Sequence, residues 1–217
     1  MTIEADRPVG PRSTKGQRTR ATLLQAAKEV FEEHGFVEAR ISDIAERAEL
    51  SYGAFYHYFT AKDEIFREVA AFHEEQLGVA VLAEIELVAG PPDTVVAARL
   101  EAATRRYLAE YRNEAGLMRV IEQVSRFDAV LHEARMRRHE QYAERLAAAV
   151  VHLQRQGLAD PLLDPTVGSQ MIMAMVTRFA ETWFVQGLVD CSFEVGVVQL
   201  NRLCLSAMGV ARPAPDE

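Results

Sequence analysis

Apolar residues recur at intervals of three and four along almost the whole chain, and no segment shows the strict alternation expected of a half-buried strand. This spacing gathers apolar side chains on one face of a helix. Glycine and proline mark the breaks, most clearly at Gly90-Pro91-Pro92. The pattern predicts an all-α fold of about nine helices. The expected helices lie near residues 14–35, 43–48, 52–59, 61–88, 93–111, 114–125, 128–156, 166–187 and 193–208.

The cysteines and the apolar segments restrict the class of protein. Only two cysteines occur among 217 residues, too few for a disulfide-stapled secreted scaffold. We expect Cys191 and Cys204 to be reduced and to pack as small apolar side chains. The N-terminus has no apolar stretch, and the most apolar segment, residues 171–176, is far shorter than the roughly 20 residues that span a bilayer. The sequence therefore predicts a cytoplasmic protein with no membrane partner.

Charge is distributed unevenly. The formal net charge of −8 falls on residues 63–217, because residues 1–62 contain equal numbers of basic and acidic side chains. Six basic residues and no acidic one lie between Arg7 and Lys28. A solvated tail is one interpretation of this basic arm, and a phosphate-seeking arm is the other.

Residues 41–62 carry the most specific signal in the chain. Two short helical segments are joined by a turn of about three residues. Ile44, Ala45 and Ala48 form the apolar face of the first segment. Phe55 and Phe59 give the second segment its core face. This layout is a helix-turn-helix, whose second helix enters the major groove of DNA.

The remaining residues of the second segment suit contact with DNA. Short side chains let the backbone approach the groove, and an alanine methyl fits against a thymine methyl. Tyrosine and histidine have polar tips that reach phosphate oxygens, and a lysine at the start of the next helix completes an anion site. Alternatively, the aromatic residues only pack three short helices together. The expected DNA contacts are Tyr52, Gly53, Ala54, Tyr56, His57 and Lys62.

Residues 14–66 resemble the DNA-binding domain of the TetR family of transcriptional regulators. The match extends over three helices and into a fourth at fixed spacing, and it covers about a quarter of the chain. The residues that carry it are Arg20, Leu23-Leu24, Ala26-Ala27, Phe31, Gly35-Phe36, Ile44-Ala45, Ala48, Leu50-Ser51, Gly53, Phe55-Tyr56, Phe59 and Lys62-Asp-Glu-Ile-Phe66.

The resemblance implies further contacts with DNA. Ser42 and Ser51 are expected to cap the second and third helices and to touch phosphate. Arg12, Lys15 and Arg18 of the basic arm are expected to reach neighbouring phosphates or the minor groove.

One residue departs from the family pattern. Glu49 stands in the turn where the family usually has glycine. If this position needs a positive φ, a non-glycine residue there costs about 1 kcal/mol.

The acidic part of the chain is expected to form a dimer. The helix near 166–187 is apolar on more than one face and must be covered on both sides. Two C-terminal helices from each chain would supply the cover as a symmetric four-helix interface, and members of the TetR family dimerise in this way. The alternative is that both helices are ordinary core.

In such regulators a small molecule binds among the middle helices and changes the separation of the two DNA-binding domains. Methionine and aromatic side chains suit an apolar pocket, although they also suit plain core. Segment 178–184 resembles family members that respond to fatty-acyl or similar lipid-derived ligands. The expected lining residues are Tyr107, Tyr111, Met118, Phe127, Met171, Met175, Arg178, Phe179 and Trp183, of which the two tyrosines and the arginine are candidates to orient a ligand.

The sequence lacks the motifs that would indicate an enzyme. It contains no HExxH, GxSxG, Walker A or GxGxxG sequence, and we expect neither a cofactor nor a metal. The predicted organisation is a disordered basic arm (1–12), a helix-turn-helix domain (13–60), a ligand-binding and dimerisation domain (61–210) and a disordered tail (211–217). We expect a homodimeric, ligand-responsive regulator, by family default a repressor, that binds a palindromic double-stranded operator. The alternatives are a helical interaction scaffold without specific DNA binding and a regulator that activates rather than represses.

Overall fold

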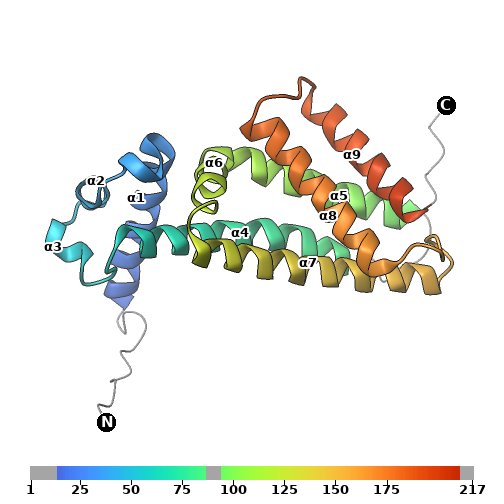
Figure 1. Cartoon of the computed structure of the whole chain (residues 1–217), viewed down its shortest axis with the longest axis horizontal. Coiled ribbons are helices and arrows are strands. Elements are labelled where there is room, and N and C mark those ends of the chain that lie inside the picture. Colours follow the sequence, from blue (N-terminus) through green and yellow to red (C-terminus); the bar gives the residue numbers. More distant parts are fainter. Residues whose placement is uncertain (1–13, 87–93, 211–217) are drawn as a thin grey trace, which may run out of the picture. The chain divides into compact units, whose positions relative to one another are not determined.

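The computed structural model describes residues 14–86 and 94–210, and every regular element in these ranges is helical (Figure 1). The prediction of an all-α fold is confirmed. The predicted arm, the Gly90-Pro91-Pro92 linker and the predicted tail lie outside the described residues. The elements are α1 (Thr14–Glu38), α2 (Ile41–Arg47), α3 (Tyr52–Phe55), α4 (Lys62–Glu86), α5 (Thr94–Asn113), α6 (Ala115–Val124), α7 (Ala129–Arg155), α8 (Pro165–Ala180), a π-helical segment η1 (Glu181–Val185) and α9 (Phe193–Met208).

The chain divides into two compact units, residues 1–72 and 73–217. The division falls inside α4, whose first turns belong to the N-terminal unit. The sequence had predicted a division at residue 60, before this helix begins.

An aromatic cluster forms the core of the N-terminal unit. The Phe66 ring meets the rings of Phe31 and Phe36 at centroid distances of 4.9 Å each. Such edge-to-face contacts add to the free energy gained from burying the rings. Arg20 of α1 forms a bidentate ion pair with Glu68 of α4 and lies over the Phe59 ring. These contacts hold α1 and the start of α4 together, so α2 and α3 rest on a fixed base.

Glycine and lysine together end the first helix. Gly35 has a φ of 72°, a conformation that costs little without a side chain. Lys62 Nζ then donates hydrogen bonds to the carbonyls of Phe36, Val37 and Ala39 at 2.6, 3.1 and 2.8 Å. A lysine is well suited to satisfy carbonyls left open at a helix end.

Two local predictions about capping and length are corrected by the structure. The N-cap of α2 is Arg40, without a side-chain hydrogen bond, and Ser42 instead lies inside the helix with its hydroxyl on Asp43 Oδ1 at 3.0 Å. The third helix is regular only over Tyr52–Phe55, because the hydrogen bond from Tyr58 N to Phe55 O tightens the chain into turns. Ser51 caps α3 as predicted, with its hydroxyl 3.2 Å from Ala54 N.

The turn after α2 is a Schellman motif with glutamate in the glycine position. Leu50 N donates to Ala45 O and Glu49 N donates to Glu46 O, both at 2.9 Å. Glu49 has a φ of 55° and is the only non-glycine residue with positive φ in the described part of the chain. The positive φ suspected from the sequence is therefore present.

Replacing this glutamate should stabilise the N-terminal unit. We expect Glu49→Gly to raise the free energy of unfolding by up to about 1 kcal/mol, since glycine relieves the left-handed strain but also loses more backbone entropy on folding. Urea denaturation measures the change. Glu46→Gly, at an exposed position within α2, is the matched control and should lose about 1 kcal/mol. An unchanged or lower stability for Glu49→Gly would contradict the strain.

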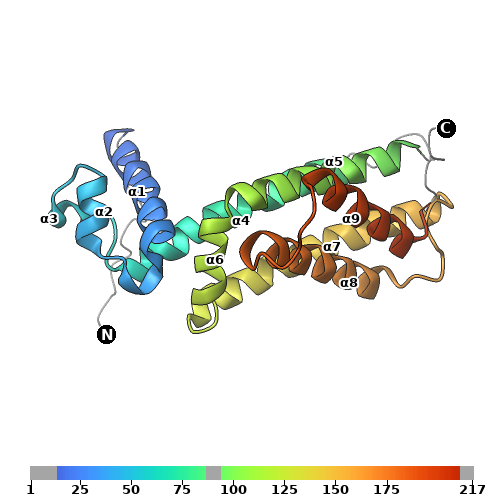
Figure 2. The ribbon, with the colours of Figure 1, turned by 90° about the horizontal axis from the view of Figure 1, so that it is seen from above.

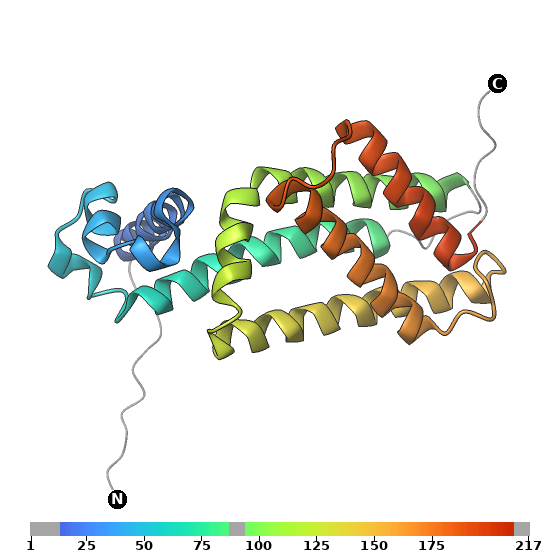
Figure 3. The same cartoon turned by 45° about the horizontal axis from the view of Figure 1, so that its top comes forward.

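The later turns of α4 and helices α5 to α9 build the C-terminal unit. α8 packs on α7, and α9 packs on both α5 and α8, an arrangement that can be followed in two further views (Figures 2 and 3). Asp128, Asp164 and Ser192 cap the starts of α7, α8 and α9 through their side-chain oxygens.

The predicted helix 166–187 changes its winding near the end. Its last part is the π-helical segment η1, in which Gln186 N bonds to Glu181 O at 3.0 Å. The wider turn lets Trp183 stack on Phe184 with ring centroids 4.4 Å apart. Gly196 of α9 approaches so closely that a Cβ there would lie 2.1 Å from the indole ring. The aromatic stack therefore depends on a glycine in the opposing helix.

Candidate DNA-binding surface and ligand cavity

The second segment of the helix-turn-helix presents two tyrosines to solvent. Tyr52 and Tyr56 are 56% and 46% exposed. Phe55, between them in the sequence, is fully buried in the core of the N-terminal unit. Their hydroxyls are 2.9 Å apart, and their rings meet edge to face. The hydrogen bond with Tyr52 raises the pKa of Tyr56. One of the two hydroxyl protons lies between the tyrosines, and the other is available to an acceptor outside the protein.

Other predicted DNA contacts lie around these tyrosines. Gly53 and His57 are exposed, and a Cβ built on Gly53 would have open space around it. Ala54 is half-buried. The backbone and the small residues of α3 are thus accessible beside the tyrosine pair.

Some of the basic residues predicted to contact DNA are exposed on the N-terminal unit, and one of them is used inside the fold. Lys15 and Arg18 are exposed on α1, whereas Arg12 lies outside the described residues. Lys62 uses all three of its donors on the carbonyls that end α1, so it is assigned to the fold rather than to a phosphate. Arg40, exposed at the start of α2, is a cation that the sequence reasoning missed. Its position just before α2, at the start of the helix-turn-helix, could have marked it as a candidate phosphate contact.

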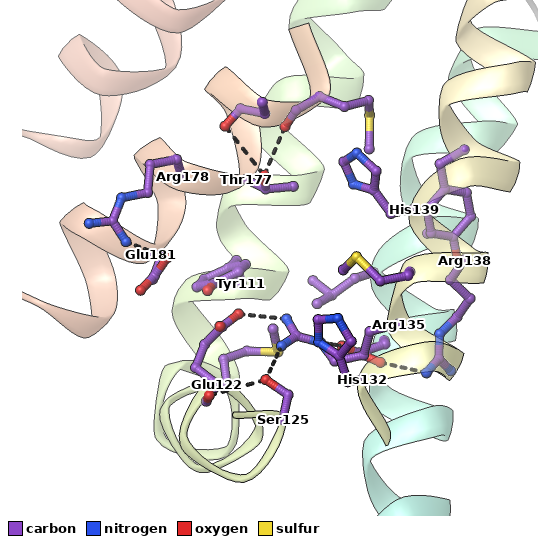
Figure 4. Close-up of a pocket in the computed structure, with 18 of the residues that line it drawn as sticks. Tyr111, Glu122, Ser125, His132, Arg135, Arg138, His139, Thr177, Arg178 and Glu181 are labelled. Carbon is purple, nitrogen blue, oxygen red and sulfur yellow. Dashed lines mark hydrogen bonds and ion pairs between the residues drawn. The ribbon is translucent and has the colours of Figure 1, made fainter. Parts of the chain in front are cut away.

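A cavity of about 960 Å³ lies within the C-terminal unit, near the upper end of the usual range for small-molecule sites. α4, α5, α6, α7 and α8 all contribute side chains to it (Figure 4). Apolar lining comes from Leu77, Met118, Phe127, Met136, Met173 and Val176.

Charged side chains on one wall of the cavity neutralise one another. Arg135 Nε lies 2.6 Å from Glu74 Oε1, and its Nη2 lies 2.5 Å from Glu122 Oε1. Arg138 pairs with the other oxygen of Glu74 at 2.7 Å, and Ser125 accepts from Arg135 at 2.9 Å. We call these five residues the ionic cluster. Burial raises the pKa of Glu74 despite its two arginine partners.

Five of the nine predicted ligand-binding residues line this cavity: Tyr107, Tyr111, Met118, Phe127 and Arg178. The other four do not, because α8 turns a different face inward. Met173 and Thr177 line the cavity, whereas Met171 is 67% exposed. Phe179 and Trp183 contact each other instead. Arg178 also forms the ion pair with Glu181, at 2.7 Å, that the sequence left open as an alternative. The residues outside the cavity are Met171, Met175, Phe179 and Trp183.

The cysteines have no partner for a disulfide. Both are free thiols, Cys191 half-buried and Cys204 buried. Burial raises the pKa of the Cys204 thiol to about 12, and a thiol of such high pKa is a poor nucleophile at neutral pH. Within residues 14–86 and 94–210, no helix is long and apolar enough to cross a membrane, and no three His, Cys, Asp or Glu side chains gather as a metal site.

The N-terminal segment matches a known family. Residues 23–69 match the family model of bacterial regulatory proteins, tetR family. Over 189 residues the chain is 25% identical to the uncharacterized HTH-type transcriptional regulator YdgC of Bacillus subtilis (strain 168), covering 86% of this chain and 92% of that protein. A shorter stretch of 63 residues is 33% identical to the HTH-type transcriptional regulator UidR of Escherichia coli (strain K12), covering 29% of this chain and 32% of UidR.

Solved structures share the fold of the whole chain. A protein of Mesorhizobium loti MAFF303099 assigned to the TetR family has a TM-score of 0.76 at 19% identity, over 91% of this chain and 98% of that one. The regulator FadR of Bacillus subtilis, solved in complex with stearoyl-CoA, has a TM-score of 0.68 at 18% identity, over 86% and 98%. The match over residues 23–69, the HTH-type relatives and the shared fold agree: the N-terminal segment matches the tetR family of bacterial regulatory proteins, and the chain has the fold of proteins assigned to that family.

Proposed function

We propose that this chain is a ligand-responsive repressor that binds a palindromic operator as a homodimer and is released by a small apolar or lipid-derived effector. The observation that carries the DNA-binding part is the exposed Tyr52–Tyr56 pair on α3, next to the accessible Gly53. Two large exposed aromatic side chains on a short, capped helix have no role in the core. They suit contact with phosphate and base edges.

An exposed apolar surface on the last two long helices supports the homodimer. On α8, Val167 and Met171 are one turn apart and are 57% and 67% exposed. On α9, Val195, Val198 and Leu203 are also exposed. Apolar side chains gathered on two neighbouring helices favour a second copy of the same surface across a two-fold axis. A dimer supplies the two DNA-binding domains that a palindrome requires.

α4 supports the coupling between effector and DNA. Its first turns supply Phe66 to the core of the N-terminal unit, and its later turns supply Glu74, Leu77 and Gly78 to the cavity. A ligand that moves the later turns would therefore act on the helix that carries the DNA-binding domain. We assign DNA binding to the N-terminal unit, effector binding and dimerisation to the C-terminal unit, and no catalytic role to either.

Structural relatives support the class of effector. FadR of Bacillus subtilis was solved with stearoyl-CoA, and a regulator from Saccharomonospora viridis was solved with choline. The mainly apolar lining of the cavity in this chain favours an apolar molecule over a small cation. A helical scaffold without specific DNA binding is the alternative, and the exposed tyrosine pair argues against it.

Selection from a random duplex DNA pool at near-physiological salt tests the proposal. Enrichment of an inverted repeat would support a dimer that reads sequence. Failure to enrich any sequence, both before and after unfolding and refolding to remove a copurified ligand, would overturn it.

The tyrosine pair should be needed for binding to the selected DNA. We expect Tyr56→Ala to weaken the affinity about tenfold, because an exposed hydroxyl that donates to phosphate contributes on the order of 1.4 kcal/mol. The thermal unfolding temperature should stay close to that of the parent. Val37→Ala, another exposed apolar residue of the same unit, is the control and should bind normally. Fluorescence anisotropy measures both, and unchanged affinity for Tyr56→Ala would remove Tyr56 from the interface.

A further inference from the structure

Two tyrosines on α5 line the cavity, and one of them has a buried hydroxyl without a hydrogen-bond partner among the described residues. Tyr107 and Tyr111 are one turn apart, with ring centroids separated by 5.9 Å, and both line the cavity. Tyr111 is only 3% exposed, and its hydroxyl has no hydrogen-bond partner among the described residues. Tyr107 is half-buried beside it and lines the same cavity. A buried hydroxyl without a partner costs about 1–3 kcal/mol, so a ligand that supplies an acceptor would recover this cost.

Both hydroxyls are available as donors at neutral pH. Burial raises the pKa of Tyr107 and of Tyr111 above the usual range, so neither phenol ionises. The complementary group on a ligand is therefore an oxygen acceptor such as a carbonyl, ester, ether or hydroxyl.

The ionic cluster argues against a charged ligand. Arg135 is already bonded to Glu74, Glu122 and Ser125. At the cavity edge Arg178 is paired with Glu181. An anion would find Arg135 and Arg178 neutralised, and a cation would find Glu74, Glu122 and Glu181 neutralised; Arg126, which also lines the cavity, is exposed to solvent. A charge buried without a partner costs several kcal/mol.

The remaining lining residues indicate that most of the ligand is apolar. Met118, Met136 and Met173 line the cavity, and unbranched methionine side chains adapt to irregular apolar shapes. We propose that the effector is an uncharged, mainly apolar molecule whose oxygen atom accepts hydrogen bonds from the hydroxyls of Tyr107 and Tyr111. This inference rests on the proposed effector site and adds the charge of the ligand and its anchor.

Three compounds with the same ten-carbon chain test the charge of the ligand. Methyl decanoate is uncharged and has a carbonyl acceptor, decanoate is an anion, and decyltrimethylammonium is a cation. Ligand-observed NMR titrations of the full-length protein, below the solubility limit of each compound, give the dissociation constants. We expect methyl decanoate to bind at least about tenfold more tightly than either ion. Equal or tighter binding of an ion, or no binding of the ester, would overturn the proposal.

Removing the two hydroxyls tests the anchor. We expect the double variant Tyr107→Phe/Tyr111→Phe to bind methyl decanoate about tenfold more weakly, from two lost hydrogen bonds. Tyr58→Phe, which removes a hydroxyl from the N-terminal unit, away from the cavity lining, is the control and should bind within about twofold of the parent. Circular dichroism checks that each variant is folded. Unchanged affinity in the double variant would remove the tyrosines from the site. Because no DNA is present, these outcomes are independent of the operator selection.

Discussion

Arg135→Met should destabilise the C-terminal unit by about 3 kcal/mol, because it leaves buried carboxylates without their main counter-charge. The Arg135 side chain is 17% exposed, and its partners Glu74 and Glu122 are 11% and 26% exposed. Methionine keeps the length and the apolar stem but removes all the donors. Arg138 still pairs with Glu74, so Glu122 loses the most. Urea denaturation followed by circular dichroism measures the loss.

A matched arginine on the same helix provides the control. The Arg137 side chain is 64% exposed, and its pair with Glu133 is 3.6 Å long. Exposed pairs contribute little, so Arg137→Met should change the stability by less than about 0.5 kcal/mol. The double variant Glu122→Gln/Arg135→Met should recover at least about 1 kcal/mol relative to Arg135→Met. A loss below about 1 kcal/mol for Arg135→Met would mean that water replaces the arginine.

Gly196→Ala should also cost about 3 kcal/mol, at the upper end of the usual range for overpacking. The added Cβ would lie 2.1 and 2.2 Å from two carbons of the Trp183 ring, whereas carbon atoms in contact are normally 3.5–4.0 Å apart. The indole is buried and stacks on Phe184 and Phe193. It cannot move away without breaking these contacts. Differential scanning calorimetry measures the lower unfolding temperature.

A glycine-to-alanine substitution at an uncrowded position separates the clash with Trp183 from the intrinsic effect of alanine on a helix. Gly53→Ala adds a methyl group where no atom lies within 4 Å. It should leave stability unchanged or raise it by up to about 1 kcal/mol, since alanine favours the helix. The smaller leucine side chain in the double variant Trp183→Leu/Gly196→Ala should make the glycine substitution less costly than it is beside tryptophan. Equal stability of Gly196→Ala and the parent would show that the aromatic stack is loosely packed.

Most of the helices were predictable because periodicity and capping are local properties. The Ser51 cap followed from residue type and position, and the family resemblance pointed to Glu49 as a position that could need a positive φ. The role of Lys62 did not, because the carbonyls that it satisfies lie more than 20 residues earlier in the chain. The π-helical turn at Glu181–Val185 was also invisible. Its wider winding accompanies the packing of Trp183, which is a tertiary property.

The cavity was predicted in composition but only half in position. α8 is apolar around most of its circumference, so periodicity alone left its rotation open, and Met173 rather than Met171 lines the cavity. Glu74 and Arg135 lie on different helices, far apart in the sequence. Their pairing depends on how α4, α6 and α7 meet. Local sequence gives no signal for such a cluster.

The aromatic stack around Trp183 also makes the chain its own spectroscopic reporter. Trp183 is the only tryptophan in the sequence, and it lies in the C-terminal unit, whereas Tyr52, Tyr56 and Tyr58 lie in the N-terminal unit. Indole emission excited at long wavelength therefore follows the C-terminal unit alone, and circular dichroism follows both units. Where the two curves separate during denaturation, the DNA-binding domain and the effector domain unfold independently of each other.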